Sequence, residues 1–212
     1  MNELLDYLAK YPHTDGNCLR HYVRTFVNDH EGYEIHTGAT RICVFHTSWD
    51  FVIKFDEAFE TTQYSALEFY HYEMAKEYNV QRVLLPTTKI ATFDNGLKIY
   101  RQAKYTLGWN DKFDHKTKEA LESAYQQTRR SKTFKKICKG MHHDTHDWWI
   151  ARATQLYGKK FMRSLQEWIK EYEINDLHTG NIGLLNGVPV LLDYAGYRGS
   201  CYTPSKEITD NY

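Results

Sequence analysis

Three oxygen-bearing side chains near the end of the sequence have the chemistry of a phosphoryl-transfer site. Asp176 and Asn181 are five positions apart, and the apolar run Val188–Leu192 leads to a second carboxylate, Asp193. One carboxylate can accept or orient the proton of an attacking hydroxyl, while a carboxylate and an amide can hold Mg²⁺ against phosphates. The alternative interpretation of the same residues is a simple β-hairpin that turns at Asn186-Gly187 and lies beside acidic residues by chance.

The stretch Asn175–Gly196, NDLHTGNIGLLNGVPVLLDYAG, resembles the catalytic and metal-binding loops of the protein-kinase-like superfamily. There, an Asp precedes an Asn by five positions and a DFG-type Asp follows one hairpin later. DLHTGN is also similar to the aminoglycoside and choline phosphotransferase branch, and the whole stretch is similar to small serine/threonine kinases of lytic phages. The resemblance implies ATP as phosphate donor, Asp176 and His178 as catalytic residues, and Asn181 and Asp193 as magnesium ligands.

The stretch also departs from the family pattern. Ile174 and Asn175 replace the His-Arg pair that normally precedes the catalytic Asp, and DYAG replaces DFG. The sequence ends 19 residues after Asp193. We therefore expect a reduced second lobe, without the long activation segment and helical subdomain by which large protein kinases position peptides.

Lys54 lies inside the apolar run FVIKF, where a charged side chain needs a partner. Considered alone, it also fits a surface lysine on an edge strand. Placed upstream of Asp176, V-I-K resembles the kinase strand lysine that pairs with the nucleotide phosphates and a helix glutamate. The segment EFYHYEMAK then aligns Glu68 as that glutamate, with Glu73 as the alternative.

The resemblance implies two further parts of an ATP site. Gly38, in the turn His36–Arg41, occupies the place of the phosphate-covering loop, whose backbone amides can approach phosphate oxygens. The three-glycine pattern of the family is absent there, and Arg41 fits a phosphate contact and a strand cap equally well. By position, Arg101–Tyr105 is the hinge that would bind the adenine edge, which makes Gln102 a cofactor-binding candidate.

The elements expected to position these residues form an α+β fold, a minimal two-lobed protein-kinase-like fold. Residues 1–103 would form an N-lobe with an antiparallel sheet, one key helix and an N-terminal helical extension. Residues 104–212 would form a short, mainly helical C-lobe. The expected helices are Asn2–Lys10, Asn17–Asn28, Thr61–Tyr78 and further helices within Trp109–Tyr172, and the expected strands lie in Glu34–Phe55, Gln81–Ala91 and Leu97–Gln102.

Two other patterns have alternative interpretations. The basic run Arg129–Lys139 could contact nucleic acid or an acidic protein, but a solvated helix face is favoured because the net charge is balanced. His142, His143 and His146 have spacing compatible with a transition metal. A helix N-terminus capped by Asp144 or Thr145 is favoured there.

Composition narrows the class of protein. The 212 residues are 42% apolar, enough for an ordinary core, and 27 basic residues balance 27 acidic ones. Hence nucleic acid is an unlikely partner, and no apolar run is long enough to span a membrane. The four cysteines form no C-x-x-C pair and no leader pattern opens the sequence, which favours reduced thiols and a cytoplasmic protein, in the host cytoplasm if it is phage-encoded.

Three hypotheses follow for function. The first is an ATP- and Mg²⁺-dependent kinase of phage or bacterial type that phosphorylates serine or threonine of a protein. The second is a small-molecule kinase that uses the same residues on a metabolite hydroxyl. The third is a non-catalytic pseudokinase that binds a partner. Retention of Lys54, Asp176, Asn181 and Asp193 argues against the third and does not separate the first two.

Overall fold

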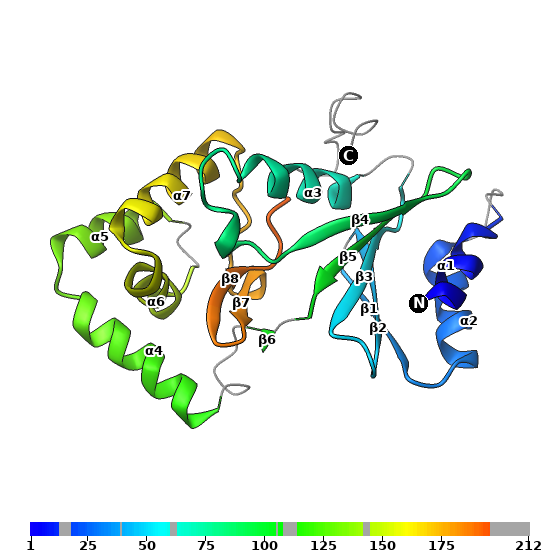
Figure 1. Cartoon of the computed structure of the whole chain (residues 1–212), viewed down its shortest axis with the longest axis horizontal. Helices are drawn as coiled ribbons and strands as arrows, with labels where there is room; N and C mark the ends of the chain where they lie inside the picture. The colour runs from blue at the N-terminus through cyan, green and yellow to red at the C-terminus, as the bar shows by residue number, and fades with distance from the viewer. Residues whose placement is uncertain are drawn as a thin grey trace. The chain divides into compact units, whose positions relative to one another are not determined.

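The structure is a computed structural model that describes residues 1–12, 18–38, 40–59, 63–104, 106–107, 114–141 and 145–195 (Figure 1). These residues form a five-stranded antiparallel sheet, a three-stranded sheet and seven α-helices. The fold is therefore mixed α and β, as predicted. The kinase-like two-lobed arrangement stays a prediction.

The described residues divide into two compact units. Unit 1 takes those within Met1–Tyr70 and Pro86–Lys104, and unit 2 takes those within His71–Leu85 and Tyr105–Arg198. Each unit has its own apolar core.

The sheet of unit 1 has the strand order β1-β2-β3-β5-β4. The strands are β1 Tyr33–Thr37, β2 Arg41–His46, β3 Phe51–Asp56, β4 Thr87–Thr92 and β5 Lys98–Ala103. Side chains alternate between the two faces of a strand. Ile53 and Phe55 therefore join the core with α1 Asn2–Ala9 and α2 Leu19–Asp29, which lie beside these strands in Figure 1. Lys54 and Asp56 project from the opposite face.

Helix α3, Tyr64–Met74, follows β3 and is shorter than the predicted Thr61–Tyr78. At its start, the backbone N–H of Ser65 donates to both carboxylate oxygens of Asp56, at 3.2 and 2.9 Å. After Met74 the chain turns, and Asn79 has a positive φ of 55° while the amide of Val80 donates to the carbonyl of Ala75.

The predicted strand Gln81–Ala91 is wrong in its first half. Gln81–Val83 is a 3₁₀ turn, and β4 begins only at Thr87. Leu84 and Leu85 instead meet Leu191, with a hydrogen bond of 2.9 Å from the amide of Leu85 to the carbonyl of Leu191. The Leu84 side chain joins the core of unit 2, which a local alternation pattern does not reveal.

Unit 2 combines four helices with a small sheet. The helices are α4 His115–Thr128, α5 Lys132–Lys139, α6 Asp147–Tyr157 and α7 Lys159–Glu171, and the strands are β6 Thr106–Leu107, β7 Ile182–Leu185 and β8 Val188–Leu191. Trp149 on α6 and Trp168 on α7 are fully buried in its core. Asn186 and Gly187 turn between β7 and β8 with φ of 53° and 77°, so the predicted hairpin is present.

Two patterns in the helical region have a structural outcome. Thr145 does not cap a helix, because the cap position of α6 is His146 and the Thr145 hydroxyl donates to the carbonyl of Leu177 at 2.7 Å. His142, His143 and Asp144 lie outside the described residues. The basic run includes α5, whose Phe134 and Ile137 are buried while its lysines are exposed, as expected of a solvated helix face.

Within the described ranges, no helix is long and apolar enough to cross a membrane. Cys18, Cys43 and Cys138 are free thiols, and Cys201 lies outside those ranges.

Candidate functional site

The predicted lysine and glutamate meet in unit 1. Lys54 on β3 donates from Nζ to Glu68 Oε2 on α3 at 2.6 Å, and both side chains are buried, Glu68 with no exposed surface. Glu73, the alternative partner, pairs with Lys76 on the helix surface. The structure therefore assigns Glu68 as the partner of Lys54, and the binding of nucleotide by this pair stays a prediction.

Three more polar side chains surround the Glu68 carboxylate. Arg41 Nη1 donates to Oε2 at 3.0 Å, and Gln102 Nε2 donates to Oε1 at 3.2 Å. The Gln102 amide also donates to Thr87 Oγ1 at 3.1 Å and accepts from Lys54 Nζ at 3.4 Å. Glu68 is thus held by side chains from β2, β3 and β5, and Thr87 is a member that sequence reasoning missed.

Burial shapes the electrostatics of this cluster. Removal from water lowers the pKa of the Lys54 ammonium, the nearby Arg41 guanidinium lowers it further, and Glu68 opposes both effects. Burial raises the pKa of Asp56 to about 6, although Arg41 and the hydrogen bonds from Ser65 act in the opposite direction. With Asp56 ionised, two cations face two carboxylates, and the cluster is neutral overall.

The structure places the two other predicted nucleotide contacts. Gln102 does not lie in a hinge, because Arg101–Ala103 belongs to β5, which pairs with β3 on one side and β4 on the other. Its backbone is therefore committed to the sheet, and its side chain instead orders the Lys54 pair. The amide of Gly38 donates to the carbonyl of Arg41 at 2.9 Å, and the binding of phosphate by this turn stays a prediction.

Arg41 forms an ion pair with Glu68, and a phosphate contact by this residue stays a prediction. Its guanidinium pairs with Glu68 and is mostly buried, with 12% of the side chain exposed. Neither of its predicted roles, a phosphate contact or a strand cap, included this contact with a buried glutamate. The charge of a buried glutamate, rather than any local motif, explains its position.

In unit 2, Asp176 and Asn181 form one hydrogen-bonded loop. Asn181 Nδ2 donates to the backbone carbonyl of Asp176 at 2.6 Å and to its carboxylate Oδ2 at 3.2 Å. The turn between them is a short 3₁₀ segment, Thr179–Asn181, and Asn181 is nearly buried. The five-residue spacing seen in the sequence therefore brings the amide under the carboxylate and fixes its orientation.

His178 lies within the same loop with one ring nitrogen committed. Nδ1 accepts a hydrogen bond from the amide of Gly180 at 2.9 Å, while Nε2 lies 3.6 Å from Asp176 Oδ1. An Nδ1 that accepts carries no proton, so the neutral ring has its N–H at Nε2, toward Asp176. A Cβ added at Gly180 would lie 2.8 Å from His178 Cε1, which makes glycine necessary for this ring position.

Asp193 follows β8, and a backbone bond ties this strand end to the loop. The amide of Leu192 donates to the carbonyl of Asn181 at 2.9 Å, and Asp193 Oδ1 accepts from the amide of Ala195 at 3.4 Å. No described residue donates to the side-chain oxygen of Asn181. An amide oxygen and a carboxylate are ligands that suit Mg²⁺.

An amide oxygen and a carboxylate suit a cation that takes its remaining ligands from phosphates and water, and the binding of Mg²⁺ by Asn181 and Asp193 stays a prediction. The part of the chain that the structure describes contains no group of three or more His, Cys, Asp or Glu side chains arranged to hold a metal. Among the described residues, Asn181 and Asp193 therefore do not belong to a metal site made only of such side chains.

Tyr194 and His71 support the segment after Asp193 and were not singled out by sequence reasoning. The Tyr194 hydroxyl donates to the carbonyl of Leu85 at 2.8 Å, and His71 Nδ1 donates to the carbonyl of Tyr194 at 2.8 Å. Both side chains are buried. Tyr194 is thus a hydrogen-bonded core residue, and its hydroxyl was the only sign of this role in the sequence.

No protein-family model, no curated protein and no solved structure matches this chain. The geometry and chemistry of the two residue clusters therefore provide the grounds for a function.

Proposed function

We propose that this protein is an ATP- and Mg²⁺-dependent phosphotransferase, a small kinase that phosphorylates serine or threonine of a protein. The observation that carries the proposal is the hydrogen-bonded loop in which Asn181 holds Asp176, with the strand end that leads to Asp193 tied to the same asparagine. A base, an amide oxygen and a second carboxylate are the side chains that phosphoryl transfer requires of a protein.

In the proposed reaction, Asp176 accepts the proton of the acceptor hydroxyl as its oxygen attacks the γ-phosphorus of ATP. The bond from that phosphorus to the bridging oxygen breaks, and ADP leaves with the electron pair. Asn181 and Asp193 would hold Mg²⁺, which neutralises developing charge on the phosphates. His178, with N–H at Nε2, can donate a hydrogen bond next to Asp176 and so orient the carboxylate or an incoming phosphoryl oxygen.

The Lys54–Glu68 pair of unit 1 supports the same proposal. A buried ion pair is a weak source of stability, because the removal of both charges from water offsets most of their attraction. The presence of the pair is better explained by a functional role of Lys54 than by stability. In the proposed enzyme, Lys54 contacts ATP phosphates while Glu68 fixes its direction.

The exposure of the loop supports a protein as acceptor. The side chains of Asp176 and His178 are 40% and 46% exposed. A serine or threonine hydroxyl has a short reach, so the residue that takes its proton must be accessible to a large molecule. A metabolite kinase normally encloses its substrate in a pocket.

The test is incubation of the purified protein with γ-labelled ATP and Mg²⁺, alone and with a cell lysate. Transfer of label to protein is expected from the wild type and is expected to be lost in Asp176→Asn and in Asp193→Asn. Asp114→Asn is the matched control, since it neutralises a carboxylate of unit 2 that only caps α4. Equal labelling by Asp176→Asn and the wild type would sink the mechanism.

Two other outcomes separate the remaining hypotheses. Consumption of ATP with a metabolite, but without labelled protein, would indicate a small-molecule kinase. Stabilisation by ATP with no transfer to any acceptor would indicate a non-catalytic module.

A further inference from the structure

A second polar attachment joins β3 to α3, next to the Lys54–Glu68 pair. Asp56 is two residues beyond Lys54 on the same face of β3, and Ser65 is three residues before Glu68 on α3. Asp56 binds the backbone of Ser65, and Lys54 binds Glu68. Lys54 and Asp56 are about 7 Å apart along the strand, and Ser65 and Glu68 are about 4.5 Å apart along the helix. The two attachments therefore lie next to each other, between a strand and a helix that run antiparallel.

The attachment at Asp56 satisfies the N-terminus of α3. The first amides of a helix lack intrahelical partners, and a carboxylate there meets both an unpaired N–H and the positive end of the helix dipole. Such a carboxylate usually comes from the residue just before the helix. Here it comes from the preceding strand, so the same bond that caps the helix also fixes its position along β3.

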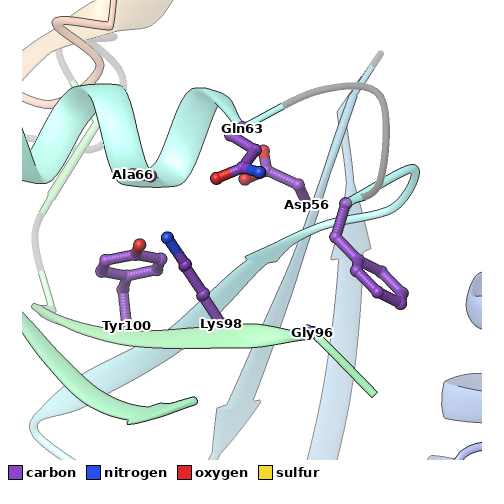
Figure 2. Close-up of a pocket in the computed structure, with 7 residues that line it drawn as sticks. Asp56, Gln63, Ala66, Gly96, Lys98 and Tyr100 are labelled. Carbon is purple, nitrogen blue, oxygen red and sulfur yellow. The ribbon is translucent and has the colours of Figure 1, made fainter. Parts of the chain in front are cut away.

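The surroundings of Asp56 hold its carboxylate in place. It is 5% exposed, and Arg41 is its direct cross-strand neighbour on β2. Figure 2 shows Asp56 beside Gln63 under the first turn of α3, with Lys98 and Tyr100 extending from β5 toward the helix. The charged and titratable groups near Asp56 are Arg41 and Cys43 from β2, Lys54 on β3, Glu68 on α3, and Lys98 and Tyr100 on β5.

We propose that Asp56 is a positioning residue for the Lys54–Glu68 pair: it anchors the N-terminus of α3 to β3 and thereby sets the register in which Glu68 meets Lys54. Without this anchor, α3 is held at Glu68 by side chains alone, and a shift of the helix separates Glu68 from Lys54. The inference rests on the proposed function only for what the pair binds; the register itself is a property of unit 1.

The anchor also borders a small pocket. Asp56 lines it together with Gln63, Lys98 and Tyr100 (Figure 2). Because burial raises the pKa of Asp56 to about 6, the anchored state binds the proton more tightly than the open state, so the anchor is expected to weaken as the pH rises through that value.

The first test compares Asp56→Ala and Asp56→Asn with the wild type by hydrogen exchange of the α3 amides and by acetylation of Lys54, both read by mass spectrometry. In Asp56→Ala, amides of Leu67–Tyr70 are expected to exchange about tenfold faster, and Lys54 to be acetylated faster, because the variant loses the cap of the helix. Asp56→Asn keeps an oxygen for Ser65 and should show a smaller change.

The matched control is Asp114→Ala. Asp114 accepts from the amide of Thr117 at 2.7 Å and caps α4, so its loss removes a similar cap from a helix that does not carry Glu68. Exchange in α3 and acetylation of Lys54 should be unchanged in this control. Wild-type rates for both in Asp56→Ala would overturn the proposal, as would faster exchange that is equal in α3 and in β2.

If Asp56→Ala does not fold, Asp56→Asn decides the matter through pH. Relative to Asp56→Asn, the α3 amides of the wild type should be better protected at about pH 5 than at about pH 7.5, because the folded state binds the proton of Asp56 more tightly than the open state does. Exchange equal to the wild type at both pH values would contradict the proposal.

A third measurement separates the proposal from the proposed function. The dissociation constant for Mg²⁺-ATP is expected to rise about tenfold in Asp56→Ala, the result of losing ~1.4 kcal/mol of preorganisation, and not in Asp114→Ala. Failure of the wild type to bind ATP would end the proposed function, while the exchange and acetylation results would still decide the role of Asp56.

Discussion

At the scale of single residues, Asn181 has the most demanding position of the candidate site. Its Nδ2 donates twice to Asp176, its backbone carbonyl accepts from Leu192, and its side-chain oxygen is left for another ligand. A carboxylate of the same shape cannot donate. The amide is therefore required by the geometry of the loop, independently of any metal.

Asn181→Asp should consequently destabilise the protein as well as inactivate it. Two carboxylate oxygens of the variant would face the carbonyl and carboxylate of Asp176, and a fall of about 2–3 kcal/mol in the free energy of unfolding at neutral pH is expected. Urea unfolding measures this. The deficit should shrink in acid, where a proton can bridge the two carboxyl groups. Asn181→Ala, which adds no charge, should show no such dependence on pH.

The position of the His178 ring depends on the absence of a side chain at Gly180. A Cβ at Gly180 would displace the imidazole, since it would lie 2.8 Å from Cε1. If the ring orients Asp176 or a phosphoryl oxygen, turnover of Gly180→Ala should fall about tenfold or more with little loss of stability. In the His178→Ala background the same change should have little further effect, because the clashing ring is gone. Full additivity of the two losses would show that they act separately.

At the scale of elements, helix α3 links the chemistry of Glu68 to a buried acid at its N-terminus. The pKa of Asp56 is about 6 in the folded protein, above its ordinary value of 3.8. The folded state thus binds this proton more tightly than the unfolded state. The resulting stability is fully present below about pH 4 and is lost as the pH rises through about 6.

The prediction is that the free energy of unfolding of the wild type, relative to Asp56→Asn, declines by on the order of 2–3 kcal/mol between about pH 4 and pH 6. Urea unfolding at several pH values measures it. Asp114→Asn should show little change over this range, because hydrogen bonds from Thr117 lower the pKa of Asp114 and its titration falls below it. A difference in the free energy of unfolding between wild type and Asp56→Asn that is constant over this range would contradict the raised pKa of Asp56.

At the scale of the whole molecule, 27 basic and 27 acidic residues leave no net charge to attract a polyanion. The most basic described element is α5, with four lysines in eight residues. We expect a random DNA duplex to bind with a dissociation constant weaker than about 0.1 mM in about 150 mM salt, as measured by fluorescence anisotropy. Micromolar binding that Lys135→Gln and Lys136→Gln abolish would show instead that α5 is a nucleic-acid surface.

Much of this protein follows from local sequence. The hairpin turn at Asn186-Gly187 forms because these residues accept positive φ, and the five-residue interval from Asp176 to Asn181 suffices for the amide to reach the loop carbonyl. The α+β class follows from patterns of apolar residues with periods of two and 3.6. Each of these properties depends on neighbours within about one turn or one hairpin.

Tertiary structure decided which polar side chains meet. Glu68 and Glu73 share a helix, and only the packing of α3 on the sheet buries the first while the second stays near the surface. The same packing brings Arg41 and Gln102 to Glu68 from 27 and 34 positions away. A buried charge must be matched by whatever partners the fold brings to it, and those partners come from other elements, beyond the range of any local pattern.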